Sequence, residues 1–309
     1  MPSPYAIAVI GVGKIATDQH LPAIAGDPRF TLAAAVSRHD TIDGLPSFPT
    51  IEALIASGIA IDAVAICTPP QVRGDIARAA IAQGWAVMLE KPPAATLAEF
   101  SDLVARAEAA GVTLLATWHS RHAFAVAAAR DWLAQRTVVS GQVAWREDVR
   151  RWHPGQTWLW APGGLGVFDP GINALSILTA ILPEPAFVMA AVLDVPANCH
   201  TPIAARIDLR TGTGEIAMEL DFLQTGPQSW DMAFETACGR RIALSDGGAT
   251  LSIDGGAAQH GPEREYPGLY ARFADLLDIG ASEADPAPLR LVADAFLLGE
   301  RRTVAAFVE

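Results

Sequence analysis

The stretch AIAVIGVGKIA, residues 6–16, sets a glycine-rich turn between an apolar run and a helix-like segment. It follows the pattern G-x-G-x-x-A, with Gly11, Gly13 and Ala16 at the small positions. The first glycine permits a tight turn, the second lets the backbone approach a pyrophosphate, and the third small residue lets a helix pack closely on a strand. The N-terminus of that helix would supply N–H groups to phosphates. Because the motif follows the first of several such runs, it predicts a dinucleotide site rather than a plain glycine turn.

Apolar runs alternate with helix-like segments from residue 1 to about residue 120. Strands that are apolar on both faces suit a parallel sheet covered by helices on both sides, and their alternation with helices indicates βαβ units. The segment 96–111 begins with Thr96 and has Glu99 three positions later, which is a capping-box pattern. The apolar runs lie within residues 6–10, 31–37, 62–70, 85–93 and 112–120.

The pattern changes after about residue 123. One helix, predicted over 123–136, is followed by closely spaced strand-like segments that alternate apolar and polar residues, as an antiparallel sheet with one wet face would. We therefore expect an α/β domain with a doubly wound parallel sheet over 1–122. An α+β substrate-binding domain is expected over 123–309.

Composition narrows the possible functions. The net charge of −12 repels phosphate backbones at long range, so nucleic acid is not an expected partner. The three cysteines form no C-x-x-C pair, and reduced thiols in a cytoplasm are the simplest interpretation. No secretory signal is visible and no uncharged apolar run is long enough for a membrane helix. We expect a cytoplasmic protein that does not bind membranes.

The segment AAVSRHD, residues 34–40, ends the second run, where dinucleotide folds read the adenosine ribose. An acidic residue there favours NAD, whereas the hydroxyl of Ser37 and the guanidinium of Arg38 suit a 2′-phosphate. NADP is therefore the expected preferred cofactor, with NAD also accepted. Alternatively, Arg38 is a solvated loop residue and Asp40 binds the ribose.

A charged pair ends the fourth run, in GWAVMLEKPPAAT, residues 84–96. Ligands bind at the carboxyl ends of strands in open α/β sheets, so Lys91 is expected to reach the nicotinamide end of the cofactor and a substrate oxygen. The prolines fix the turn, and the Lys91–Pro92 bond is a candidate for the cis form. The alternative is that Glu90 and Lys91 form a surface ion pair.

A second polar pair lies in GGLGVFDPGINALSIL, residues 163–178. Asp169 and Asn173 are four positions apart and share one face of a predicted helix. A carboxylate and an amide on an otherwise apolar helix start indicate a site; the alternative is that Asp169 caps the helix.

In this order and spacing, the G-x-G-x-x-A, EKP and GG…D-x-G-x-N motifs resemble the family of glucose–fructose oxidoreductase, inositol dehydrogenase and MocA proteins over essentially the whole chain. More narrowly, segments such as ATWHSR, EDVRRWHPGQ and PLRLVADAFL are similar to bacterial L-arabinose/D-galactose 1-dehydrogenases. The resemblance implies a Rossmann domain and a C-terminal α+β domain with an open, mostly antiparallel sheet. It also implies that the last helix packs back near the Rossmann domain.

The same resemblance implies NAD(P)-dependent oxidation of an aldopyranose (L-arabinose, D-galactose or D-fucose) at C1 to the aldonolactone. Many members of the family carry His where this chain has Asn173. An amide cannot act as a base, so Asp169 and Lys91 are the candidate proton acceptors and Asn173 would orient the sugar. An inositol dehydrogenase, or a dinucleotide-sensing regulator without catalysis, remains open as an alternative.

Tryptophans and histidines add candidate sugar contacts, because sugars pack C–H faces on indole rings and need fixed hydrogen-bond partners. Core packing is the alternative for the tryptophans, and a solvated strand face is the simpler interpretation of Glu147. No third ligand accompanies His119 and His122, so no metal is expected. The residues expected to bind the sugar are Lys91, His119, Glu147, Trp152, His153, Asp169 and Asn173. Those expected to bind the cofactor are Gly11, Gly13, Lys14, Ile15, Ser37, Arg38, Cys67, Thr68, Pro69, Glu90 and Lys91.

Overall fold

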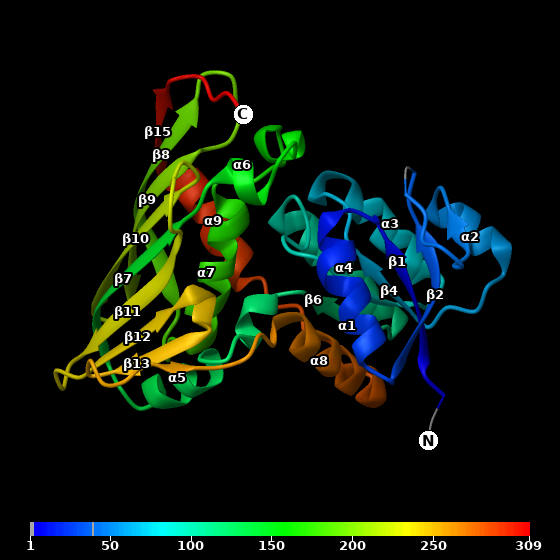
Figure 1. The fold of residues 1–309 in the computed structure, drawn as a ribbon, viewed down its shortest axis with the longest axis horizontal. Coiled ribbons are helices and arrows are strands. Elements are labelled where there is room, and N and C mark those ends of the chain that lie inside the picture. Colours follow the sequence, from blue (N-terminus) through cyan, green and yellow to red (C-terminus); the bar gives the residue numbers. More distant parts are fainter. Residues whose placement is uncertain (1–2, 39) are drawn as a thin grey trace. The chain divides into compact units, whose positions relative to one another are not determined.

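The computed structural model describes residues 3–38 and 40–309. The chain forms two compact units, each with its own sheet (Figure 1). Unit 1 comprises Met1–Trp118 and Tyr266–Pro286, and unit 2 comprises His119–Glu265 and Ala287–Glu309.

Unit 1 contains a parallel sheet of six strands in the order β3-β2-β1-β4-β5-β6. This is the strand order of a doubly wound dinucleotide-binding fold, and it reverses direction between β1 and β4. The prediction of a Rossmann-type α/β domain is confirmed. The strands are β1 Tyr5–Ile10, β2 Phe30–Val36, β3 Ser47–Phe48, β4 Ala63–Ile66, β5 Ala86–Leu89 and β6 Leu114–Ala116. The helices of residues 1–118 are a π-helical turn Ala16–His20, α1 Leu21–Gly26, α2 Ile51–Ser57, α3 Pro70–Ala82 and α4 Leu97–Ala110.

The start of α4 illustrates how local sequence sets an element. Thr96 is extended, and its hydroxyl accepts a hydrogen bond from the backbone N–H of Glu99 at 3.2 Å. Such a cap stabilises a helix by about 1 kcal/mol. Gly111 ends the helix in the left-handed region with φ 64°. The helix predicted from the capping-box pattern is therefore present with its expected cap.

Helix α8, Glu265–Ile279, supplies a distant part of the core of unit 1. Its buried aromatic face packs on Phe30: the ring of Tyr270 lies 5.5 Å and that of Phe273 6.0 Å from the Phe30 ring. The chain then runs beside β6, where Glu283 accepts a hydrogen bond from Ala116 N at 3.0 Å. The observed division thus differs from the expected boundary at 122/123, because residues 266–286 return to unit 1.

Unit 2 contains a mixed, mostly antiparallel sheet of nine strands in the order β14-β13-β12-β11-β7-β10-β9-β8-β15. Strand β9 alternates exposed and buried residues along its length, so one face is covered and the other is open. Helices α5, α7 and α9 lie on the covered face (Figure 1). The last long helix, α9, belongs to unit 2, where it packs on α7 and β8.

The strands of unit 2 are β7 Val138–Arg146, β8 Ala186–Pro196, β9 Ala204–Thr211, β10 Gly214–Asp221, β11 Ser229–Thr236, β12 Arg241–Ser245, β13 Thr250–Ile253, β14 Gln259–His260 and β15 Gly299–Val304. Its helices are α5 Val126–Leu133, α6 Val149–Trp152, α7 Phe168–Ile181 and α9 Ala287–Leu298, with single turns at His119–His122, Thr157–Trp160 and Asp246–Gly248. Across the described residues, no helix is both long and apolar enough to span a bilayer.

Candidate functional site

The glycine-rich turn follows β1 at the carboxyl edge of the parallel sheet, beside the point where the strand order reverses. Gly11 has φ +91°, and a Cβ there would lie 2.8 Å from the backbone nitrogen of Thr68. Only glycine fits this close approach between the turns that follow β1 and β4. A Cβ at Gly13 would meet no atom within 4 Å, so the backbone of Gly13 borders open space. This cradle suits a pyrophosphate, which needs backbone N–H groups without intervening side chains. Lys14 and Ile15 follow in the same turn, and the Lys14 ammonium forms an ion pair with Asp18.

The predicted ribose-reading residues lie at the end of β2, next to that turn. Arg38 and Asp40 are exposed, and the hydroxyl of Ser37 accepts a hydrogen bond from Asp40 N at 3.1 Å. The adjacent His39 lies outside the described residues. Both Arg38 and Asp40 are therefore accessible to a ribose or its 2′-phosphate.

The turns after β4 and β5 carry the other predicted cofactor residues. Cys67, Thr68 and Pro69 follow β4, and the thiol of Cys67 packs against the core of unit 1. Lys91 follows β5 and is half-buried, and the Lys91–Pro92 bond, a candidate for the cis form, is cis. Glu90 is only 3% exposed, so Glu90 and Lys91 are not a surface ion pair. The carboxylate of Glu90 turns inward to protein partners in unit 1.

Those partners include residues that the sequence motifs did not single out. His20 Nε2 lies 3.0 Å from the Glu90 carboxylate, and the hydroxyl of Tyr270 lies 2.8 Å from His20 Nδ1. Burial opposes charging of His20, but its interactions with Cys67, Tyr270 and Glu90 outweigh burial and raise its pKa well above the usual value. Burial raises the pKa of Tyr270 to about 12.

In unit 2, helix α7 carries the predicted pair. Val167 is the residue that precedes the helix, and Asp169 lies in the first turn, so Asp169 does not cap α7. Its side chain is buried, whereas Asn173, one turn later, is half-buried. The buried carboxylate of Asp169 and the half-buried amide of Asn173 therefore lie on one face of the helix.

Glu147 connects Asp169 to other predicted sugar contacts. Its Oε1 lies 3.1 Å from His153 Nε2, and its Oε2 accepts a hydrogen bond from Trp230 Nε1 at 2.9 Å. His153 Nδ1 lies 3.7 Å from Asp169 Oδ2. The ring of Trp152 lies 5.2 Å from that of Trp230.

Two corrections follow from this cluster. Glu147 is 4% exposed, so its interpretation as part of a solvated strand face is wrong. The reason is the indole of Trp230 and the imidazole of His153, which satisfy the carboxylate in the interior. Trp230 was missed by the sequence analysis, although the alternation of apolar and polar residues along β11 could have drawn attention to it.

His119 forms a separate pair in unit 2. Its Nδ1 is held by the carboxylate of Glu265, and the hydroxyl of Ser120 lies 3.3 Å from the same nitrogen. The sequence motifs did not indicate Glu265, because it lies 146 positions after His119 in the chain. Among the residues that the structure describes, no group of three His, Cys, Asp or Glu side chains is arranged to hold a metal.

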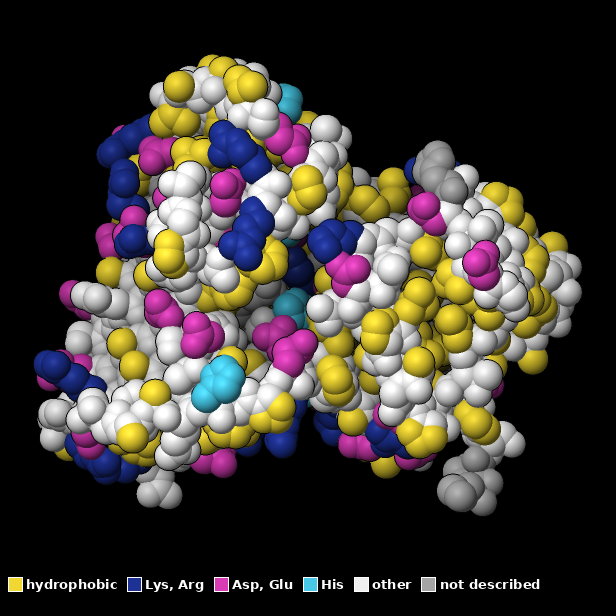
Figure 2. Space-filling view, viewed as in Figure 1, with side chains coloured by type: hydrophobic (Ala, Val, Ile, Leu, Met, Phe, Trp, Pro, Cys, Tyr) yellow, Lys and Arg dark blue, Asp and Glu magenta, His cyan; other side chains and the backbone are white. Residues whose placement is uncertain are grey.

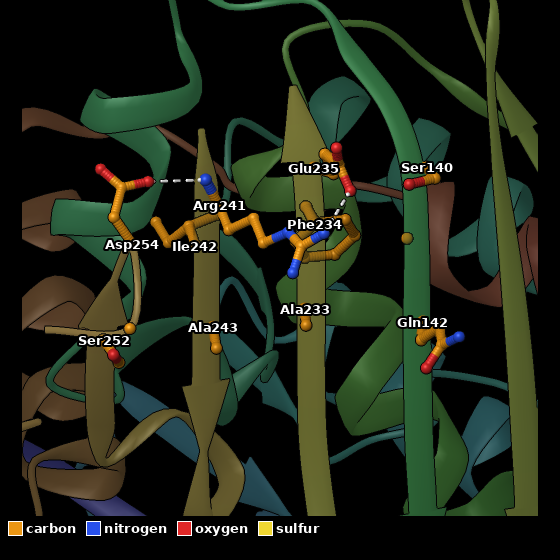
Figure 3. Close-up of a pocket in the computed structure, with 12 residues that line it drawn as sticks. Ser140, Gln142, Ala233, Phe234, Glu235, Arg241, Ile242, Ala243, Ser252 and Asp254 are labelled. Carbon is orange, nitrogen blue, oxygen red and sulfur yellow. Dashed lines mark hydrogen bonds and ion pairs between the residues drawn. The ribbon is translucent and has the colours of Figure 1, made fainter. Parts of the chain in front are cut away.

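The open face of the nine-stranded sheet has a hollow that is separate from the groups of residues described above (Figure 3). Arg241 there pairs with Glu235 at 3.2 Å, and Asp254 accepts a hydrogen bond from Arg241 N at 2.8 Å. The hollow contains none of the predicted site residues. On the face shown in Figure 2, basic side chains are interspersed with acidic ones. The hollow is lined by Ser140, Gly141, Gln142, Ala233, Phe234, Glu235, Arg241, Ile242, Ala243, Ser252, Asp254 and Gly255.

Comparison with known proteins identifies the family of this chain. Residues 5–117 match the family described as the GFO_IDH_MocA oxidoreductases with an NAD-binding Rossmann fold. The chain is also 44% identical to galactose 1-dehydrogenase of Pseudomonas fluorescens over 307 residues, which covers 99% of each protein. The chain belongs to the GFO_IDH_MocA oxidoreductase family. The family resemblance and the expectation that the chain is an enzyme are confirmed.

Solved structures share the whole fold. A D-galactose-1-dehydrogenase protein from Rhizobium etli is 54% identical, with a TM-score of 0.94 over 100% of this chain and 99% of its own. A 3-ketoreductase of Actinomadura kijaniata in complex with NADP is 16% identical, with a TM-score of 0.81 over 99% of this chain and 100% of its own. At that identity the likeness to the ketoreductase concerns the fold alone.

Proposed function

We propose that the chain oxidises an aldopyranose at C1 to the aldonolactone, with NADP preferred and NAD accepted. The observation that carries the proposal is the cluster of buried carboxylates in unit 2. Glu147 and Asp169 lie on either side of the His153 ring, next to the indoles of Trp152 and Trp230. This combination suits a sugar, which offers hydroxyls to fixed acceptors and C–H faces to indole rings. The similarity to galactose 1-dehydrogenase over 99% of the chain supports the same substrate class.

The residues at the carboxyl edge of unit 1 would hold the cofactor. The turn of Gly11 and Gly13 would receive the pyrophosphate, with Lys14 and Ile15 beside it, and Ser37 and Arg38 would receive the 2′-phosphate. The turns after β4 and β5, with Cys67, Thr68, Pro69, Lys91 and the backbone of Glu90, would border the nicotinamide end. When bound, the cofactor accepts the hydride from C1 of the sugar.

Loss of the hydride from C1 requires that the C1 hydroxyl lose its proton. The carboxylate of Asp169 and the amine of Lys91 are the candidate acceptors, and Lys91 also polarises the C1 oxygen. Asn173 orients the sugar, because its amide can donate and accept hydrogen bonds but cannot take a proton. Glu147 fixes the ring of His153, whose other nitrogen faces Asp169.

We expect the enzyme to accept L-arabinose, D-galactose and D-fucose. These sugars share their configuration from C1 to C4 and differ in the substituent at C5. A single small group is a weak basis for discrimination in a pocket. Free thiols at Cys67, Cys199 and Cys238 agree with a cytoplasmic location, which we also propose.

The test is a steady-state assay of cofactor reduction by ultraviolet absorbance. L-Arabinose, D-galactose, D-fucose, D-xylose, D-glucose and myo-inositol are each offered with NADP⁺ and with NAD⁺. Reduction with the first three sugars, fastest with NADP⁺, is the expected result, and mass spectrometry of the product should give the lactone or its acid. Activity on myo-inositol instead would replace the proposal with an inositol dehydrogenase. Tight cofactor binding without turnover of any sugar would favour a regulator.

A further inference from the structure

A buried polar cluster in unit 1 surrounds the carboxylate of Glu90, the residue before Lys91. Glu90 Oε2 accepts hydrogen bonds from Thr117 Oγ1 at 3.0 Å and from Tyr266 OH at 3.3 Å. On its third side lies His20 Nε2, at 3.0 Å. These partners come from the π-helical turn after β1, the end of β6 and helix α8. The Glu90 cluster consists of His20, Glu90, Thr117, Tyr266 and Tyr270, all less than 4% exposed.

The backbone on both sides of Lys91 is also held by hydrogen bonds from a buried side chain. Arg73 on α3 is 2% exposed, and its Nη1 donates hydrogen bonds to the carbonyls of Glu90 and of Pro92. Its Nη2 donates to the carbonyl of Thr68, at the end of the neighbouring strand. One guanidinium therefore fixes the residues before and after Lys91 relative to β4.

Stability alone is a weak reason for this arrangement. Charged groups are costly to bury, and well-packed apolar side chains would often stabilise a core as well or better. Interactions with Cys67, Tyr270 and Glu90 raise the pKa of His20 well above its usual value, which favours a charged imidazole 3.0 Å from the Glu90 carboxylate. The buried groups converge on the two residues that flank Lys91, the position to which the proposed function gives a chemical role.

Lysine is also rare in this chain. Of 22 basic Lys and Arg residues, only Lys14 and Lys91 are lysines. A guanidinium stays protonated in proteins, whereas an amine can release and take up a proton. A lysine at this position agrees with a role that arginine cannot fill.

We propose that Glu90 is a positioning residue for Lys91. Its carboxylate, anchored by His20, fixes the end of β5 so that the Lys91 amine is held at the carboxyl edge of the sheet. The inference rests on the proposed function, in which Lys91 acts on the C1 oxygen. Glu90 itself touches neither the sugar nor the reacting atoms in this account.

A double-mutant cycle between Glu90→Gln and Lys91→Ala tests the proposal in the full chain. Glutamine keeps the size of the side chain and removes its charge. Misplacing a catalytic group by about 1 Å can lower the reaction rate by about 100-fold. We therefore expect Glu90→Gln to lower kcat by roughly 10- to 100-fold. KM for the sugar and Kd for NADP⁺ should stay within about threefold. In the Lys91→Ala background, the same change should alter kcat by less than about twofold.

A matched control separates positioning from loss of stability. Thr236 in unit 2 is 1% exposed, and its buried hydroxyl donates to the carbonyl of Arg240 at 2.9 Å. Thr236→Val should lower Tm without changing kcat. If Glu90→Gln does not fold, Thr117→Val removes one donor to the carboxylate at nearly constant volume and should give a smaller effect of the same kind.

A second readout does not depend on turnover. Reductive ¹³C-methylation labels the amines, and Lys14 and Lys91 are the only lysines to observe by NMR. Glu90→Gln should shift the Lys91 resonance, assigned with Lys91→Ala, and leave that of Lys14 in place. An unmoved Lys91 resonance, or equal kcat losses from Glu90→Gln in both backgrounds, would overturn the positioning role of Glu90 and leave the proposed function standing. If Lys91→Ala itself leaves kcat unchanged, the proposed role of Lys91 fails first.

Discussion

Replacing Gly13 by alanine should strengthen the fold and weaken cofactor binding at the same time. The φ of Gly13 is not in the left-handed region, and a Cβ there would meet no atom within 4 Å. Alanine at a compatible position restricts the unfolded chain and stabilises a protein by about 0.4–1 kcal/mol. The same methyl group would occupy the space that we assign to the pyrophosphate. We expect Kd for NADP⁺ to rise by at least about tenfold, which corresponds to about 1.4 kcal/mol.

Gly11→Ala is the contrasting variant. Gly11 has φ +91°, and its Cβ would lie 2.8 Å from Thr68 N and 3.0 Å from the Cys67 carbonyl carbon. Left-handed backbone costs an ordinary residue about 1–2 kcal/mol, and overpacking costs about 1–3 kcal/mol more. This variant should therefore lose about 2–5 kcal/mol of unfolding free energy without any ligand present.

Urea unfolding followed by circular dichroism gives the stability of each variant, and fluorescence titration with NADP⁺ gives Kd. At a cofactor concentration of about 100 times the wild-type Kd, binding stabilises the wild type by about 2.7 kcal/mol. A variant that binds tenfold more weakly gains only about 1.4 kcal/mol at that concentration. An unchanged Kd for Gly13→Ala would refute the placement of the pyrophosphate against this turn. Destabilisation of the ligand-free Gly13→Ala protein would contradict the conclusion that a Cβ at residue 13 meets open space.

Three further changes test other parts of the proposal. Arg38→Ala should reduce the preference for NADP⁺ over NAD⁺ in kcat/KM, and an unchanged ratio would favour Asp40 as the residue that reads the ribose. Asp169→Asn should lower kcat by roughly 10²- to 10⁴-fold, the usual contribution of a general base, while Kd for NADP⁺ is retained. Because the folded-state pKa of His20 is raised, its charge stabilises the protein fully below about pH 6.5, its unfolded value, and this contribution is lost as pH rises towards the folded pKa. The Tm difference between wild type and His20→Gln should therefore shrink with increasing pH above neutrality, and a difference that grows would contradict the raised pKa.

Features with short-range causes could be predicted from the sequence. The glycine turn, the parallel βαβ arrangement of unit 1 and the capped start of α4 depend on residues a few positions apart or on the period of apolar runs. The pairing of Asp169 and Asn173 on α7 depends on helical spacing, which is equally local. These features also decide the family, because its motifs lie at strand ends and helix starts.

Features that depend on distant partners could not be predicted. Glu147 looks like a solvated strand residue until Trp230, 83 positions later, is known to donate to it. Helix α8 has an aromatic face, but nothing in its pattern says which of the two sheets that face covers. Polar residues are especially prone to this error, because a buried carboxylate and an exposed one have the same local sequence signature and differ only in what lies opposite.

The same reasoning explains why buried acids mark the candidate sites of both units. Glu90 and Glu147 each follow a strand directly, and each carboxylate contacts a histidine and a hydrogen-bond donor from a distant element. An arrangement of this kind fixes the end of the strand and the histidine ring together, because loss of either partner leaves a buried charge unpaired. In unit 1 the fixed strand end carries Lys91, and in unit 2 the fixed ring faces Asp169. In the proposed function, each candidate proton acceptor thus lies beside a strand end or ring that a buried carboxylate contacts. This is the physical basis for expecting Glu90→Gln to act on kcat rather than on binding.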